Sequence, residues 1–317
     1  MRTRRAVDRR HDGVVAGGQP LPRRAAPELA ATEADRADSA NREGNMKRQV
    51  TGALRRSILL VTAVLATSLV AAGPAQAITN GQPDSDQHPN VGLMVVNFGS
   101  GPEPFCTGTL IAPKSFLTAA HCIAIVQQFD GETIGVTFDS RTFDPSRPFI
   151  PAVDTVVDPG FGHDQGDFHD LAVITLKDPA PAAAAVLPTA GLLDQLTAHG
   201  GLRGQQFTNV GYGAIGIARG GGKPDLIKDF MRRFATPPFL ALRNTVLKLL
   251  LNTNATGQGG NCFFDSGSPV FLNTGSGDVL VAVVSLKADQ ACVANGFNYR
   301  LDTPSARAFL GQFVTLP

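Results

Sequence analysis

Short apolar runs recur along residues 91 to 286, and Gly, Pro, Asn or Asp follows closely after each of them. The runs are four to eight residues long, which is typical of β-strands and too short for most helices. We expect strands at Val91 to Phe98, Gly108 to Ile111, Ile134 to Phe138, Leu171 to Leu176, Phe207 to Tyr212 and Val279 to Leu286. Such regular spacing predicts an all-β barrel or sandwich.

A clear helix is predicted only at the C-terminus. Asp302 or Thr303 can cap it, and Pro304 suits its first turn. One face of this helix carries Ala306, Phe309, Leu310 and Phe313. Residues 179 to 204, rich in Ala and Gly, suit a crossing between two halves, whereas residues 225 to 251 fit either helix or strand and are interrupted by two prolines.

The first 77 residues read as material outside the folded domain. Residues 1 to 45 are rich in Arg, Ala and Glu without apolar periodicity, which predicts disorder. Residues 46 to 77 read as a signal peptide, with basic residues, then the apolar run Ile58 to Ala72, then the small-residue site Ala75-Gln76-Ala77. A bilayer span needs about 20 residues, so this run is too short for one. Met46 is an alternative translation start. We therefore expect export to the extracellular medium and no membrane attachment after cleavage.

Beyond residue 77 the chain carries 15 basic and 20 acidic residues, a formal charge of −5. Because the basic excess of the chain lies in its first 77 residues, nothing beyond them argues for a nucleic-acid partner, and we expect none. All four cysteines lie in this part, and an even count in an exported chain favours two disulfides. Metal binding is the alternative, but no CxxC pair is present and the histidines lack ligand spacing. We expect neither a metal nor another cofactor.

Three polar residues in separate motifs suggest nucleophilic catalysis. Ser266 lies in "GGNCFFDSGSPVF", a turn-like stretch that equally suits a plain hairpin loop. A hydroxyl needs a base, and His121 in "LTAAHC" is a candidate, although a lone His is more often a surface or core residue. Asp170 precedes an apolar strand, where an acid is usually a strand-end cap, but a buried carboxylate there can orient the imidazole. The order His, Asp, Ser supports the three as one triad.

With these motifs in place, residues 78 to 317 resemble a secreted bacterial member of the chymotrypsin/trypsin family of serine proteases. The resemblance is carried by Ile78-Thr79-Asn80-Gly81, Ala119-Ala120-His121-Cys122, Asp170-Leu171-Ala172, Gly211-Tyr212-Gly213, Asp265-Ser266-Gly267-Ser268-Pro269 and Gly296-Phe297-Asn298-Tyr299-Arg300. It implies two six-stranded antiparallel β-barrels, over roughly residues 78 to 195 and 196 to 317, with the active site between them.

The resemblance also implies roles for individual residues. His121 is then the general base, Asp170 its orienting carboxylate and Ser266 the nucleophile that forms an acyl-enzyme. The amine of Ile78 pairs with Asp265, and signal cleavage after Ala77 would itself create that amine. The implied disulfides are Cys106–Cys122 and Cys262–Cys292. The implied partners are protein or peptide substrates and proteinaceous inhibitors of a monomeric enzyme.

Phe264 departs from the family pattern, which has Gly at this position. Its backbone N–H and that of Ser266 would form the oxyanion hole, and Gly suits backbone conformations that a side chain resists. Two interpretations remain open. Either Phe264 leaves this peptide misoriented, or it is tolerated and its ring lies over the cleft.

The resemblance places Gly260 at the floor of the primary specificity pocket, with Ser285, Lys287 and Gly296 along its walls. No carboxylate is then available to bind Arg or Lys, so we expect a non-basic, apolar or small side-chain preference. Lys287 stands where the family has Gly, and its side chain would narrow the pocket or attract acidic groups. The expected function is a secreted endopeptidase, and the alternative is a protease-fold binding or decoy protein with weak or lost catalysis.

Overall fold

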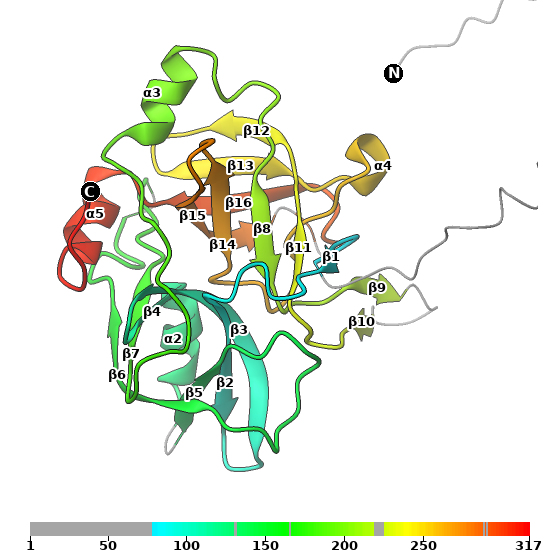
Figure 1. The fold of residues 1–317 in the computed structure, drawn as a ribbon, viewed down its shortest axis with the longest axis vertical. Helices are drawn as coiled ribbons and strands as arrows, with labels where there is room; N and C mark the ends of the chain where they lie inside the picture. The colour runs from blue at the N-terminus through cyan, green and yellow to red at the C-terminus, as the bar shows by residue number, and fades with distance from the viewer. Residues whose placement is uncertain (1–77, 130–131, 165, 219–224, 288, 290) are drawn as a thin grey trace, which may run out of the picture. The chain divides into compact units, whose positions relative to one another are not determined.

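The computed structural model describes residues 78–317, apart from residues 130–131, 165, 219–224, 288 and 290 (Figure 1). The predictions of a disordered extension and a signal peptide concern residues 1–77 and lie outside the described residues. None of the described helices is long and apolar enough to cross a membrane.

The first half of the domain is a closed antiparallel barrel in the order β2-β3-β4-β7-β6-β5. Its strands are β2 (Val91–Asn97), β3 (Pro102–Ala112), β4 (Ser115–Thr118), β5 (Thr133–Thr137), β6 (Ile150–Val157) and β7 (Ala172–Leu176). Met94 and Val96 of β2 pack in one core cluster, while Leu93 and Val95 pack in another. Because alternate side chains of a strand point to opposite faces, both faces of β2 are buried, and its sequence is accordingly an almost continuous apolar run.

The second half is an eight-stranded sheet in the order β1-β11-β8-β14-β15-β16-β13-β12. Its strands are β1 (Gln82–Pro83), β8 (Thr208–Gly211), β11 (Arg233–Ala235), β12 (Phe239–Leu242), β13 (Val246–Leu250), β14 (Pro269–Asn273), β15 (Asp278–Lys287) and β16 (Asn295–Arg300). A separate hairpin pairs β9 (Gly216–Ala218) with β10 (Asp225–Ile227).

Pro237 and Pro238 allow this sheet to curl into a half-barrel. They separate β11, the second strand of the order, from β12, the last strand at the other end. Beside them, Phe207 N donates to Pro237 O at 3.1 Å and Gln206 forms a bridge with Pro238, so the two ends of the sheet approach each other. The structure therefore assigns strands to the stretch from 225 to 251 that the sequence left between helix and strand. The prediction of a mostly-β, chymotrypsin-like fold is confirmed, with a closed six-stranded barrel in the first half and an eight-stranded half-barrel sheet where a second six-stranded barrel was expected.

Four helices are described: α2 (Ala120–Val126), α3 (Leu192–Ala198), α4 (Thr253–Thr256) and α5 (Pro304–Leu310). Helix α5 is the predicted C-terminal helix, and its cap is Thr303, whose hydroxyl accepts a hydrogen bond from Ala306 N at 3.3 Å. Asp302 instead accepts from Leu193 N at 2.8 Å, at the start of α3. The helix ends at Leu310, so Phe313 lies beyond it and stacks edge-on against Phe309.

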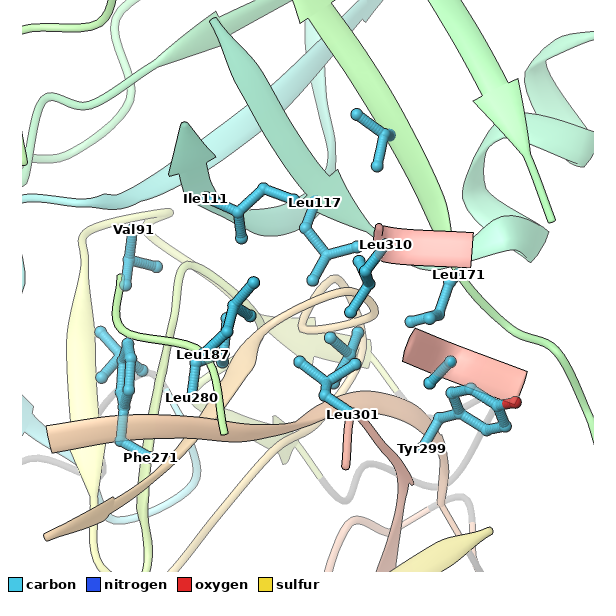
Figure 2. Close-up of a cluster of buried hydrophobic side chains, with 14 of the residues drawn as sticks. Val91, Ile111, Leu117, Leu171, Leu187, Phe271, Leu280, Tyr299, Leu301 and Leu310 are labelled. Carbon is cyan, nitrogen blue, oxygen red and sulfur yellow. The ribbon is translucent and has the colours of Figure 1, made fainter. Parts of the chain in front are cut away.

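One buried hydrophobic cluster joins the two halves (Figure 2). The first barrel contributes Val91, Ile111, Leu117 and Leu171, the second contributes Phe271, Leu280, Tyr299 and Leu301, and α5 contributes Leu310. Burial of this apolar surface stabilises the contact between the barrels, because each side chain removed from water contributes about 1.5 to 3 kcal/mol. The residues at the border of the barrels are thereby held in one arrangement.

Candidate active site

His121 and Asp170 are brought together by two different elements of the first barrel. His121 lies in the first turn of α2, and Asp170 lies two residues before the start of β7. The ring nitrogen Nδ1 of His121 lies 2.9 Å from Asp170 Oδ2, and the backbone N of His121 donates to Asp170 Oδ1 at 3.0 Å. A carboxylate on Nδ1 holds the imidazole in the tautomer whose Nε2 is free to accept a proton.

Asp170 is almost completely buried, with 2% of its surface exposed. Burial alone raises the pKa of a carboxyl group, but here hydrogen bonds from His121 and Ser285 outweigh that effect and hold the pKa of Asp170 below its usual value. The Ser285 hydroxyl donates to Oδ2 of Asp170 from β15 in the second half. The carboxylate therefore stays ionised next to the imidazole, which is the state that stabilises an imidazolium.

Ser266 faces the same cleft as His121. The cleft has a volume of about 340 Å³ and is lined by His121, Asn261, Cys262, Phe263, Phe264, Ser266, Val284, Ser285 and Leu286. No hydrogen bond joins Ser266 Oγ to His121 in the described part of the chain, and such contacts are often long before a substrate binds. His121 and Ser266, predicted from two distant motifs, thus line one cavity at the border of the two halves, and Asp170, from the third motif, is hydrogen-bonded to His121 without lining it.

The turn before Ser266 is anchored by the first barrel. In β3, Thr107 N donates to Ser266 O at 2.9 Å, and Thr107 Oγ1 donates to Phe264 O at 3.1 Å. Gly267 has a φ of +83°, and a Cβ on it would lie 2.2 Å from both Thr107 O and Thr118 Oγ1. Only glycine fits at this close approach, and the serine turn is thereby held against β3.

Phe264 occupies the third position of a β-turn that Asp265 N closes by donating to Cys262 O at 3.3 Å. Its φ is +71°, the left-handed region that suits glycine at this turn position. The Phe264 ring packs edge-on against Phe230, with centroids 5.1 Å apart, and Lys228 Nζ lies 5.1 Å from the centroid of Phe264. Among the described residues, neither Phe264 N–H nor Ser266 N–H donates to a protein acceptor. Both residues line the cleft.

Asp265 is fully buried and is bound by backbone donors. Gly213 N donates to Oδ1 and Cys262 N donates to Oδ2, both at 2.8 Å. Burial raises the pKa of Asp265 to about 7, although these two hydrogen bonds act in the opposite direction. Within the described residues, Asp265 forms no ion pair. Ile78 follows Ala77 in the chain, so its nitrogen is an amide; the residue is fully buried, and the next one, Thr79, pairs with Gly260.

The four residues expected around the specificity pocket lie in different surroundings. Gly260 faces the buried Leu251, because a Cβ on Gly260 would lie 2.3 Å from Leu251 Cδ2. Gly296 faces Asn261 first and Leu251 second, because a Cβ on Gly296 would lie 2.6 Å from Asn261 Oδ1 and 3.5 Å from Leu251 Cδ1. Neither glycine lines the cleft, whereas Ser285 does. Lys287 pairs with Gly296 through its backbone, and its side chain lies outside the described part of the structure.

Three contributions to the site were not foreseen from the sequence. Asn261 lines the cleft at 1% exposure, and its Oδ1 has no hydrogen-bond partner among the described residues. Thr107 holds the serine turn, and Ser285 binds Asp170 instead of acting only as a pocket wall. The one sequence signal for Asn261 was that it is a polar residue directly before Cys262. The other two contacts link residues more than 100 positions apart, so no local pattern indicates them.

The structure contains the disulfides Cys106–Cys122 and Cys262–Cys292. The first joins β3 to α2 directly beside His121, and the second closes a loop between the serine turn and the segment before β16. In both cases the bridge constrains a segment that lines the cleft. No group of three or more metal-ligating side chains is found among the residues that the structure describes.

Comparison with known proteins agrees with this geometry. The Trypsin family model matches residues 78–308. A Phytophthora infestans protein named glucanase inhibitor protein 4 is 23% identical over 193 residues, which cover 60% of this chain and 72% of that relative. The family match spans most of the chain and includes both barrels and every residue of the candidate site. The chain therefore belongs to the trypsin family.

Proposed function

We propose that the chain from residue 78 onward is an exported serine endopeptidase with a preference for small or apolar, non-basic side chains. The observation that carries the proposal is that His121, bound to a buried and ionised Asp170, lines the same cleft as Ser266. A base, its orienting acid and a hydroxyl in one cleft form the arrangement that acyl transfer requires.

In the proposed reaction, Ser266 Oγ attacks the carbonyl carbon of a peptide bond while its proton passes to His121 Nε2. The negative charge that develops on the carbonyl oxygen is stabilised by the N–H groups of Phe264 and Ser266. The C–N bond then breaks as His121 returns the proton to the leaving amine. Water, activated by the same imidazole, hydrolyses the acyl-enzyme and restores the Ser266 hydroxyl.

The preference for small side chains is supported by Leu251 and Asn261. Leu251 fills the space beside Gly260 and Gly296, so little depth is left at that end of the cleft for a long side chain. The oxygen of Asn261 offers a polar acceptor there, and no acidic residue lines the cleft among those described. We expect protein or peptide substrates, proteinaceous inhibitors that occupy the same cleft, and a monomeric enzyme.

Cleavage after Ala77 would free the amine of Ile78 in this proposal. The amine would then pair with Asp265, whose carboxyl group is buried next to Gly213 and Cys262. Two disulfides suit an oxidising compartment, which supports an extracellular location.

A reagent that labels activated serines tests the proposal. A fluorophosphonate forms a covalent bond to Oγ only where a base removes the proton, so we expect the native protein to be labelled and Ser266→Ala to be unlabelled. Ser268→Ala is the matched control, because it changes a buried serine of the same turn, and its labelling should persist. Absence of labelling in a correctly folded native protein would refute the endopeptidase.

The second candidate is a protease-fold protein that binds a partner without catalysis. The similarity to a protein named as a glucanase inhibitor and the unusual backbone of Phe264 favour it. This candidate predicts no fluorophosphonate labelling together with tight, saturable binding of a protein partner at the cleft.

A further inference from the structure

A second cavity, of about 420 Å³, lies between the segment before Asp170 and the turn that joins β12 to β13. Gly166 and Phe168 line it from the first side, and Thr245 from the second. Thr245 Oγ1 donates to Gly166 O at 3.4 Å, which ties the two sides together. Phe297 of β16 provides a second aromatic wall. We call this cavity the β13 pocket.

The β13 pocket is positively charged. Lys248 Nζ lies 4.4 Å from the centroid of the Phe297 ring, and Arg243 is exposed at the turn. Of the described residues that line the pocket, these two are cationic and none is acidic. Neither cation forms an ion pair in the part of the chain described here, unlike Arg141, Arg147 and Arg300. The chain beyond residue 77 carries net negative charge, so acidic side chains outnumber basic ones. Two neighbouring cations that nevertheless lack an ion-pair partner therefore point to a ligand of opposite charge.

A buried arginine binds the backbone of the turn that carries Arg243. Arg300, with 1% of its surface exposed, donates through Nη1 to Arg243 O at 3.0 Å and to Asn244 O at 2.9 Å. Asp302 and Asp194 neutralise the Arg300 guanidinium. The backbone of the β12–β13 turn is therefore held in place before any ligand binds, which lowers the entropy cost of binding.

A row of side chains connects the catalytic cleft to the β13 pocket. Leu286, which lines the cleft and is 52% exposed, is the cross-strand partner of Phe297, and Phe297 is the partner of Lys248. Directly paired residues point to the same face, and neighbouring strands lie about 5 Å apart. Lys248 is thus about 10 Å from Leu286, a distance that an extended peptide covers in about three residues.

We propose that the β13 pocket binds the carboxylate of a glutamate or aspartate in a peptide whose backbone occupies the Ser266 cleft. The aliphatic part of the side chain would lie between Phe168 and Phe297, with the carboxylate at Lys248 and Arg243. The effect of this binding on kcat/KM rests on the proposed endopeptidase function. The binding itself requires only the cleft and the pocket. It assigns to this chain a preference for acidic peptides at a position away from the scissile bond.

Peptides that carry a single Glu at successive positions, each compared with the Gln peptide, test the proposal. Their binding to Ser266→Ala is measured by fluorescence anisotropy, and their kcat/KM is measured with the native protein. The pocket variants are Lys248→Met and Arg243→Gln, and Lys248→Arg keeps the charge. Lys177→Gln is the control. Lys177 is an exposed cation just after the C-terminal end of β7, whereas Asp170 lies before the N-terminal end of that strand.

We expect about fivefold tighter binding of the Glu peptide at one position, the size of a favourable, partly exposed ion pair. The preference should be lost in Lys248→Met and reduced in Arg243→Gln, retained in Lys248→Arg and Lys177→Gln, and weakened at about 0.5 M NaCl. No preference at any position, or one that both charge-removing variants retain, would overturn the pocket.

The two proposals fail in different ways. If Ser266→Ala binds the Glu peptide selectively while the native protein cleaves nothing, the pocket stands and the endopeptidase does not. If the native protein cleaves Glu and Gln peptides equally at every position, the endopeptidase stands and the pocket is refuted. Neither cleavage nor binding at millimolar peptide would refute both.

Discussion

Phe264 has a backbone conformation that glycine would adopt with less strain. A left-handed residue with a side chain costs about 1 to 2 kcal/mol, and here the turn closed by Asp265 N and the contact with Thr107 hold it in place. The same turn aims one of the two N–H groups of the proposed oxyanion hole. Strain at Phe264 therefore favours other conformations of this peptide, in which its N–H no longer points toward the oxyanion.

We predict that Phe264→Gly raises kcat by up to about tenfold with little change in KM. The relieved strain, about 1.4 kcal/mol, would act on an interaction made only in the transition state. Steady-state kinetics on a peptide substrate measure both constants. Phe264→Ala is the control, because it removes the ring but keeps the Cβ and should give no gain in kcat. An unchanged kcat in Phe264→Gly would mean that the N–H is already correctly placed and that Phe264 serves only to line the cleft.

A pH dependence is predicted for Asp265. Its pKa rises from the ordinary 3.8 in the unfolded chain to about 7 in the folded chain that continues upstream of Ile78. Between about pH 4 and 7 the folded state binds a proton that the unfolded state has released, so this residue's contribution to the free energy of unfolding falls as pH rises. Above about pH 7 the contribution is constant.

The free energy of unfolding is measured as a function of pH for the native chain and for Asp265→Asn, and the value for the variant is subtracted from the native value at each pH. This difference should decrease from pH 4 to 7 in the upstream-extended chain. In a chain that begins at Ile78, a new amine next to the carboxylate would lower the pKa of Asp265, and the decrease should disappear. Identical slopes in the two chains would argue against the Ile78–Asp265 pair.

At the scale of elements, α2 and the serine turn are each fastened by a disulfide. Helix α2 is only seven residues long and has no side-chain cap, so its own hydrogen bonds stabilise it little. Cys122, inside α2, is bonded to β3, and β3 in turn holds the serine turn through Thr107. One strand therefore positions both the base and the nucleophile.

We predict that the double variant Cys106→Ala/Cys122→Ala loses about 3 kcal/mol of stability, the loop entropy expected for a bridge across 16 residues. Its kcat should also fall below that of the native protein under conditions where it remains folded, because His121 is then less firmly placed. Denaturant unfolding and active-site titration measure the two effects. A variant with native kcat would show that the barrel positions α2 without the bridge.

At the scale of the whole molecule, a buried arginine links the N-terminal segment and both barrels. Arg232, just before β11, is fully buried and binds Asp84 Oδ2 at 2.8 Å, together with the backbone oxygens of Val91 and Phe138 at 3.0 Å. Its Nη1 also lies 3.2 Å from the hydroxyl of Tyr212. Asp84 is also bound by the backbone N and the ring Nδ1 of His88, but among these partners Arg232 alone connects it to the two barrels.

We predict that Arg232→Met lowers the free energy of unfolding by about 3 to 5 kcal/mol, because the buried Asp84 is left without its arginine. Arg141→Met is the matched control: it removes an arginine from an exposed pair with Asp139 and should change stability little. Equal effects in the two variants, measured by denaturant unfolding, would refute the role of Arg232 as a link between the barrels.

Much of the fold and the candidate site follows from local patterns. The apolar runs mark strands because their length and turn residues act locally, and β2, β5, β7, β8 and β15 lie at the predicted positions. Thr303 and Pro304 mark the start of α5 for the same reason. His121, Asp170 and Ser266 stand out because each sits in a short motif whose residue types suit one chemical role.

Tertiary structure alone decides the contacts between residues distant in the chain. Ser285 reaches Asp170 across 115 positions, and Leu251 fills the space beside Gly260 and Gly296 only after three strands have paired. The β13 pocket likewise forms only when the segment before Asp170 meets the β12–β13 turn. Side-chain packing and long-range hydrogen bonds select these neighbours, and they depend on the closed barrel and the curled sheet rather than on any local run of residues.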